Sequence, residues 1–217
     1  MEKVGSNGVP DRLARASAQQ TSGCGMWILL LSLSILFLAS LVGYLFIHFF
    51  REPETGSGFP PLPGGLWLST VVLLASSATV HWALSAARRD NKQLVKTAMT
   101  VTLLLGLAFL VLQALNWAEL HRILASWIAA NGVASSQALR FYTVSFYFMT
   151  VLHAAHVLGG IIPMAGATAA SYRGFYTRTS HNGLRLLSMY WHFLDIVWLV
   201  LFAVLSLSLG SLHAAPQ

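Results

Sequence analysis

The sequence predicts an all-α integral membrane protein with five membrane-spanning helices. Of its 217 residues, 56% are hydrophobic and only 9% are charged, whereas charged residues make up about 25% of an ordinary soluble domain. Five apolar stretches are also each long enough to cross the roughly 30 Å hydrocarbon core of a bilayer. These predicted spans are residues 26–50, 66–87, 94–117, 139–170 and 186–209.

The N-terminal part of the chain is predicted to be a tail followed by the first span. Residues 1–25 are rich in Ser, Gly, Ala and Gln and show no apolar periodicity, so we expect a mobile tail. The span 26–50 contains no Asp, Glu, Lys or Arg. Residues 51–65 then combine many prolines and glycines, which predicts a loop without helix.

The second and third spans carry polar residues in two different patterns. On the second span, hydroxyl and imidazole side chains recur at helical spacing, which predicts a stripe that packs against a neighbouring helix. This stripe consists of Thr70, Ser77, His81 and Ser85. Residues 88–92 predict a short turn. The third span ends in polar residues typical of an interfacial belt, and residues 121–138 form a connection with room for a short surface helix. The polar end consists of Gln113, Asn116, Trp117 and Glu119.

The fourth predicted span, residues 139–170, is longer than a perpendicular crossing requires. We therefore expect it to tilt, to protrude or to kink at Pro163. His153 and His156 share one face of this helix, because residues three apart lie on the same side. Ala155 and Gly159 form a small-xxx-small pair, which predicts a close helix contact.

The fifth predicted span organises the rest of the chain, because it holds an acid and a histidine in hydrocarbon. His192 and Asp195 are three residues apart, so the imidazole is expected to donate to the carboxylate. Ionisable groups at this depth are costly and usually have a function. Two interpretations stay open: a buried structural pair that ties this helix to a neighbour, or a site of proton movement, lipid head-group binding or metal ligation.

The distribution of basic residues predicts the orientation. The tail and the loops after the second and fourth spans hold ten of the 13 Lys and Arg residues. By the positive-inside rule, the N-terminus is cytoplasmic and the C-terminus is outside, which makes residues 212–217 a short external tail. Basic groups beside the cytoplasmic head groups are candidates for binding lipid phosphate. They are Arg88, Arg89, Arg173 and His181.

The sequence lacks the motifs of several enzyme classes. The sequence has no HExxH, Walker or GxSxG motif and only one cysteine, Cys24, so no catalytic or metal-ligating residue is assigned. The net charge of +6 is spread over loop edges, which favours anionic lipid over nucleic acid as a partner.

A b-type cytochrome needs two histidines at equal depth on facing helices to hold each haem. On straight helices His156 lies about 21 Å and His192 about 8 Å from the cytoplasmic interface. His81 is level with His192, but one level pair does not form a two-haem electron path.

Three stretches resemble subunit III of the haem-copper respiratory oxidases, in the short bacterial form with five spans. Residues 190–198 read Tyr-Trp-His-Phe-Leu-Asp-Ile-Val-Trp, beside Tyr-Trp-His-Phe-Val-Asp-Val-Val-Trp in that family. Residues 150–160 match its helix with a His-x-x-His step, and residues 74–83 resemble its Ser-rich stretch that ends in Trp-Ala. The likeness extends from Gly25 to Gly210.

This resemblance implies a non-redox accessory subunit of a proton-translocating cytochrome c or quinol oxidase, which reduces oxygen to water in a bacterial plasma membrane. The implied partners are subunit I in direct contact and subunit II, with or without a small subunit IV. Haem and copper would lie in those partners, and this chain would bind only structural phospholipid. Residues implied to brace the helices are His81, His153, His156, His192 and Asp195. Trp191 and Trp198 join the basic residues as implied lipid contacts.

Two departures from the family pattern keep alternatives open. The family has buried acids where this chain has Leu33 and Asn116. Glu119, one turn after Asn116, is a candidate to compensate for the second acid. The alternatives are an accessory subunit of a nitric oxide reductase-type relative, a haem-b membrane cytochrome and a transporter.

Overall fold

The computed structural model describes the backbone of residues 8–50, 61–131 and 137–213, and the side chains of residues 23–46, 61–130 and 139–207. Within these ranges the chain forms five α-helices and no β-strand. Each helix contains a segment long and apolar enough to cross a membrane, which confirms the all-α, five-span prediction. The helices are α1 (Gly8–Phe50), α2 (Gly65–Arg88), α3 (Lys92–Asn131), α4 (Gln137–Tyr172) and α5 (Asn182–His213).

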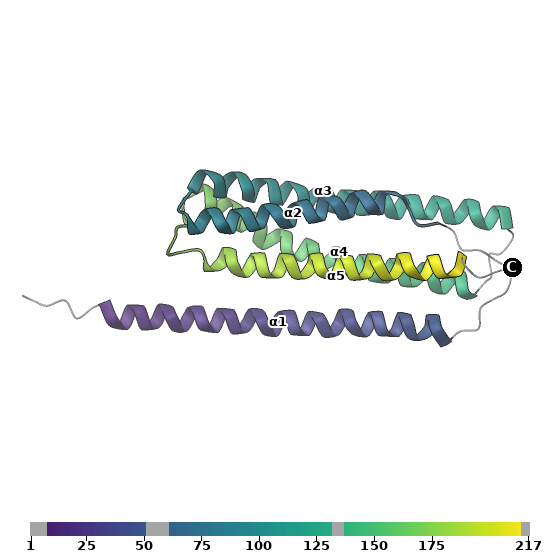
Figure 1. The fold of residues 1–217 in the computed structure, drawn as a ribbon, viewed down its shortest axis with the longest axis horizontal. Coiled ribbons are helices and arrows are strands. Elements are labelled where there is room, and N and C mark those ends of the chain that lie inside the picture. Colours follow the sequence, from purple (N-terminus) through teal and green to yellow (C-terminus); the bar gives the residue numbers. More distant parts are fainter. Residues whose placement is uncertain (1–7, 51–60, 132–136, 214–217) are drawn as a thin grey trace, which may run out of the picture.

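Successive helices run in opposite directions, as Figure 1 shows. The start of α1, the α2–α3 turn and the α4–α5 loop lie at one end of the bundle. The basic loops therefore gather at a single end, as the positive-inside rule requires of one membrane face. Which end faces the cytoplasm stays a prediction from the sequence.

Local backbone chemistry sets both connections at this basic end. In the α2–α3 turn Asp90 adopts a left-handed conformation (φ 56°), and the Asn91 side chain caps α3 by accepting from the Leu94 N–H at 3.0 Å. Gly174 (φ 74°) follows the end of α4. The N–H groups of Gly174 and Phe175 donate back to α4 carbonyls, which is a Schellman ending.

Two helices extend more than ten residues beyond the predicted spans. Helix α1 already begins at Gly8, within the expected tail, because Ala, Leu, Arg and Gln continue the helix of the span favourably. Helix α3 passes through the expected exit near residue 117 and ends at Asn131. Its extension packs against Leu139 and Tyr142 of α4, and this contact stabilises a helix beyond the predicted span.

Other boundaries follow the prediction more closely. Residues 51–60 of the proline-rich connection lie outside the described residues, and α2 begins at Gly65. Helix α4 continues through Pro163 and crosses the bundle obliquely (Figure 1). Residues 1–7 and 214–217, at the two predicted tails, also lie outside the described residues.

Helix α2 packs most extensively on α3, while α4 contacts α3 and α5. Helix α5 also contacts α2, and α1 lies on the far side of α5 (Figure 1). The buried face of α1 repeats every three to four residues, as expected of a helix that packs on one side only. This face includes Leu30, Leu33, Phe37 and Tyr44.

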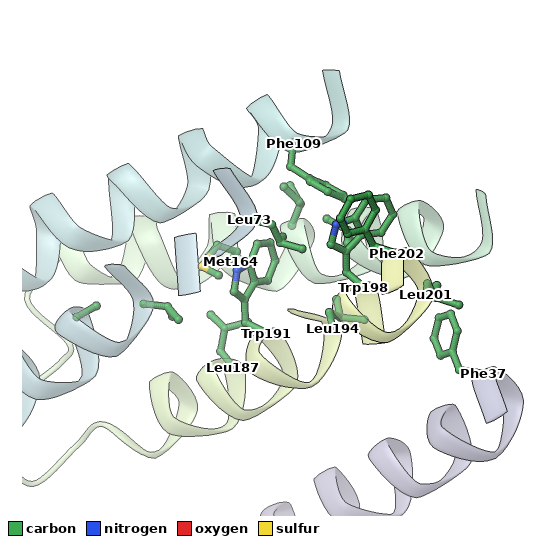
Figure 2. Close-up of a cluster of buried hydrophobic side chains, with 14 of the residues drawn as sticks. Phe37, Leu73, Phe109, Met164, Leu187, Trp191, Leu194, Trp198, Leu201 and Phe202 are labelled. Carbon is green, nitrogen blue, oxygen red and sulfur yellow. The ribbon is translucent and has the colours of Figure 1, made fainter. Parts of the chain in front are cut away.

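Two tryptophans of α5 form the centre of the core. Trp191 and Trp198 are each 1% exposed, and Figure 2 shows them among buried side chains that include Leu73 and Phe109. Gly160 of α4 makes room for Trp191, since a Cβ there would lie 2.8 Å from the Tyr190 ring and 3.2 Å from Trp191. A glycine at this position therefore allows α4 and α5 to approach closely.

Candidate functional site

Polar side chains concentrate between α2 and α5, and we call this region the α2–α5 seam. Trp198 Nε1 donates to Thr70 Oγ1 at 3.0 Å, and Trp191 Nε1 donates to Ser76 Oγ at 2.9 Å. A third contact joins Ser77 Oγ and His192 Nδ1 at 2.6 Å. Side-chain hydrogen bonds of this kind hold helices together in lipid. The seam consists of Thr70, Ser76, Ser77 and His81 on α2 and Trp191, His192, Asp195 and Trp198 on α5.

The structure corrects the expected hydrogen bond between His192 and Asp195. The two residues share a face, but His192 Nδ1 lies 3.8 Å from Asp195 Oδ2, which is too long for a hydrogen bond. The nearby Ser77 hydroxyl is bonded to that nitrogen instead. The Asp195 side chain is 4% exposed, and neither carboxyl oxygen has a hydrogen-bond partner among the described residues. Asp195 is therefore a buried acid behind His192.

His81 occupies a different position from the rest of its predicted stripe. Thr70 and Ser77 bond to α5 as a packing stripe should, whereas His81 is exposed. Its ring centroid lies 6.3 Å from that of His192, with a tilt of 50°. His81 therefore lies beside His192, the histidine that the sequence placed at the same depth in the membrane. Ser85 is half-buried on the same helix.

A second set of polar contacts joins α3 to its neighbours. Asn116 Nδ2 donates to Ser69 Oγ of α2 at 3.4 Å, and Thr79 of α2 shares a hydrogen bond with Thr102 of α3 at 2.8 Å. Trp117 Nε1 donates to Thr150 Oγ1 of α4 at 3.0 Å. Asn116 and Trp117 were expected to lie in an interfacial belt, yet their side chains connect α3 to α2 and α4 inside the bundle.

The two histidines of α4 lie in unlike surroundings. His153 is fully buried, with its ring centroid 5.1 Å from that of Trp198 and 5.9 Å from that of Phe109. Neither ring nitrogen of His153 has a partner among the described residues. His156 is half-buried, and its Nδ1 lies 2.7 Å from the carbonyl oxygen of Leu152.

The predicted close contact at Ala155 and Gly159 is not made among the described residues. Both residues are exposed, and no atom lies within 4 Å of a Cβ built on Gly159. The close approach occurs one residue later, at Gly160. Spacing alone did not distinguish the two faces of α4, because small residues occur on both.

The residues expected to contact lipid divide into two groups. Arg88, Arg89 and Arg173 are exposed at the basic end, and His181 is half-buried with Nδ1 3.3 Å from the Thr177 carbonyl oxygen. In the same loop, burial raises the pKa of Tyr176 above its usual value.

Trp191 and Trp198 were also expected to contact lipid, and the structure corrects this. Both side chains are buried in the seam, because their N–H groups find hydroxyl partners on α2 that spacing within α5 alone does not reveal. The sequence did not identify three hydroxyl residues that also join helices: Ser69, Ser76 and Thr102. A Ser or Thr in a spanning helix is weak evidence of an interhelical bond, since its hydroxyl also bonds to the backbone of its own helix.

Among the described side chains, no group of three or more His, Cys, Asp or Glu residues could hold a metal ion. The donors and acceptors of the seam are mostly bonded to one another. Such an arrangement fixes helix positions and leaves only His81, His192 and Asp195 with unused polar atoms.

Ser77→Ala is expected to lower the thermal midpoint of the purified chain in detergent by a few degrees. The change removes one interhelical hydrogen bond, worth about 0.6 to 2 kcal/mol in a membrane. Ser40→Ala is the matched control, because the Ser40 hydroxyl donates only to Leu36 of its own helix at 2.9 Å. Equal midpoints for the two variants would show that the Ser77–His192 bond does not stabilise the bundle.

Comparison with known proteins identifies the family. Residues 14–208 match the family described as Cytochrome c oxidase subunit III. The chain belongs to this family. Among its relatives, Cytochrome c oxidase subunit 3 of Polypterus ornatipinnis and that of Scyliorhinus canicula are each 33% identical over 184 residues, covering 77% of this chain. The protein of the same name from Squalus acanthias is 32% identical over 186 residues. The chain spans 65% of the length of these relatives.

Within the cytochrome c oxidase subunit III family, this chain is a divergent member. Leu33 and Asn116 stand where the resemblance implies acids, and both side chains are buried. Asn116 is hydrogen-bonded to Ser69. Glu119, expected to compensate, instead forms a 2.6 Å ion pair with Arg122 on the exposed side of α3, so it does not take over the position of Asn116.

Proposed function

We propose that this chain is a non-redox accessory subunit of a haem-copper terminal oxidase in a bacterial plasma membrane. Its role is to brace the catalytic subunit I, in a complex that also holds subunit II and in some cases a small subunit IV. Haem and copper belong to those partners. Family membership supports the assignment to this class of complex, and the five spans support a membrane location.

The observation that carries the bracing role is the use of polar groups in the α2–α5 seam. Three side-chain hydrogen bonds connect α2 to α5, and two more connect α2 to α3. Helix α2 is therefore fixed from two sides. Polar groups that are bonded in this way position a rigid surface and are not free to react with a substrate.

Structural phospholipid is the second part of the proposal. Three exposed arginines, Arg88, Arg89 and Arg173, lie at the end of the bundle where the basic loops gather. Guanidinium groups bind phosphate through paired hydrogen bonds. We infer that these arginines, together with His181, hold lipid phosphates at one membrane surface.

The direct test is purification of the tagged chain in mild detergent, with mass spectrometry of its partners and a reduced-minus-oxidised spectrum. We expect a haem-copper catalytic subunit to co-purify and the haem bands to remain with that partner when the complex is dissociated. Haem bands in the isolated chain, or a chain that purifies without any haem-copper protein, would contradict the proposal.

Leu33 and Asn116 favour one second candidate, an accessory subunit of a nitric oxide reductase-type relative. Neutral residues at both positions remove the acids that the resemblance associates with this subunit of proton-translocating oxidases. Metal analysis of the same purified complex separates the two candidates. Copper together with haem iron supports the oxidase, whereas haem iron with non-haem iron and no copper supports the relative.

A further inference from the structure

We propose that the outer edge of the α2–α5 seam, where His81 and His192 emerge with Asp195 behind them, docks a membrane-spanning helix of the catalytic subunit. The docked helix presents a carboxyl or hydroxyl side chain to the two imidazoles. This inference rests on the proposed function and adds to it the surface of contact and the chemistry of the partner.

The outward faces of α3 and α4 differ from this edge. Helix α3 exposes only aliphatic side chains along its central turns, and α4 exposes an aliphatic and aromatic face. Such surfaces are satisfied by lipid acyl chains, which offer no hydrogen bonds. The exposed residues are Val101, Leu104, Leu107, Val111 and Leu115 on α3, and Val144, Phe148, Val151, Leu158 and Ile162 on α4.

His81 requires a hydrogen-bond partner that the described residues do not supply. Its side chain is exposed, and no hydrogen bond to it is formed among the described residues. Arg88, at the end of α2, is seven residues further along, which is about 10 Å on an α-helix. An imidazole is too short to reach head groups over that distance, and an unpaired polar group in hydrocarbon is costly.

His192 offers a second hydrogen-bonding atom beside His81. Its Nδ1 is held by Ser77 at 2.6 Å, while the side chain is 36% exposed. When the Ser77 hydroxyl donates to Nδ1, the proton of the neutral ring is on Nε2, which is then a donor. The buried Asp195 carboxyl lies 3.8 Å from the same Nδ1 atom, so it does not occupy Nε2.

The spacing of the two rings suits a single acceptor group. With centroids 6.3 Å apart, both imidazoles can hydrogen-bond to the same carboxyl or to neighbouring hydroxyls of one helix. Trp82, adjacent to His81 and 61% exposed, adds a large aromatic surface of the type that anchors protein interfaces. A lipid phosphate is disfavoured, because the arginines that mark the head-group level lie two turns away.

The test places a photo-crosslinking amino acid at position 81 of the full complex, with position 101 on the outer face of α3 as the control. We expect crosslinks from position 81 to a spanning helix of the catalytic subunit, and mainly lipid adducts from position 101. Crosslinks from position 81 to lipid alone, or to a second copy of this chain, would overturn the inference while leaving the proposed function intact. Failure of any haem-copper protein to co-purify with the unmodified chain would overturn the proposed function itself, and the inference with it.

A pair of histidine variants provides a second measurement. His81→Leu should reduce the catalytic subunit retained per chain after detergent washing by roughly five- to tenfold, the loss expected for one intramembrane hydrogen bond. His121→Leu, at an exposed histidine in the extension of α3, should retain the partner fully. Equal retention in both variants would contradict a role of His81 in docking.

Discussion

Replacing Trp198 by alanine is expected to lower the free energy of unfolding by about 3 to 5 kcal/mol, as for other buried aromatic residues. Trp198 is 1% exposed, and its ring lies edge-on to Phe109 with centroids 5.1 Å apart. The substitution opens a cavity between α3, α4 and α5. It also removes the donor to Thr70 on α2, so four helices lose a common contact.

The matched control is Trp82→Ala, which removes the same side chain from a site that is 61% exposed. Thermal unfolding of the purified chain, followed by circular dichroism in one detergent, compares the two variants. We expect a large loss for Trp198→Ala and little change for Trp82→Ala. Trp198→Phe isolates the hydrogen bond and should cost about 1 kcal/mol. Similar losses for both alanine variants would show that Trp198 is not a centre of the core.

The second large effect is expected at Gly160, where leucine should destabilise the chain by about 1 to 3 kcal/mol or more through overpacking. A Cβ at this position would lie 2.8 Å from Tyr190 Cε1. The Tyr190 ring is not free to move aside, because its hydroxyl donates to the His156 carbonyl oxygen at 2.9 Å. We therefore expect α4 and α5 to separate locally.

Gly159→Leu is the control for this prediction. Gly159 precedes Gly160 in the same helix, so the change in helix propensity is matched, but no atom lies within 4 Å of a Cβ built there. Thermal midpoints of the two variants in detergent should therefore differ by several degrees. A loss in Gly159→Leu as large as that in Gly160→Leu would mean that helix propensity, and not the contact with Tyr190, determines the effect.

Composition and hydropathy were sufficient to predict the fold class, because hydrocarbon permits few alternatives for a chain with five long apolar stretches. They did not predict the end of α3. Hydropathy reports where a helix leaves the membrane, whereas the continuation to Asn131 depends on packing against Leu139 and Tyr142. Tertiary contacts of this kind are not visible in the periodicity of one segment.

The candidate site was predicted in part. Spacing correctly placed His192 and Asp195 on one face, but the atom that binds His192 belongs to Ser77, on another helix. Spacing within α5 could not reveal this partner, because the contact depends on how α2 packs against α5. The same limitation applies to Trp191 and Trp198, whose type suits both a lipid boundary and a core, so that only the position of α2 decides between the two.

The placement of α1 has a consequence for the order of synthesis. Its principal neighbour is α5, which begins at Asn182, about 130 residues after the end of α1 and therefore roughly 7 to 26 s later at ribosomal speed. Until then the nascent α1 resides in the bilayer without α5, first alone and later with ring contacts from Phe37 and Tyr44 to α4. A helix without its neighbours must be stable in lipid on its own. Gly23–Phe46 meets this condition, because it contains no acidic or basic residue.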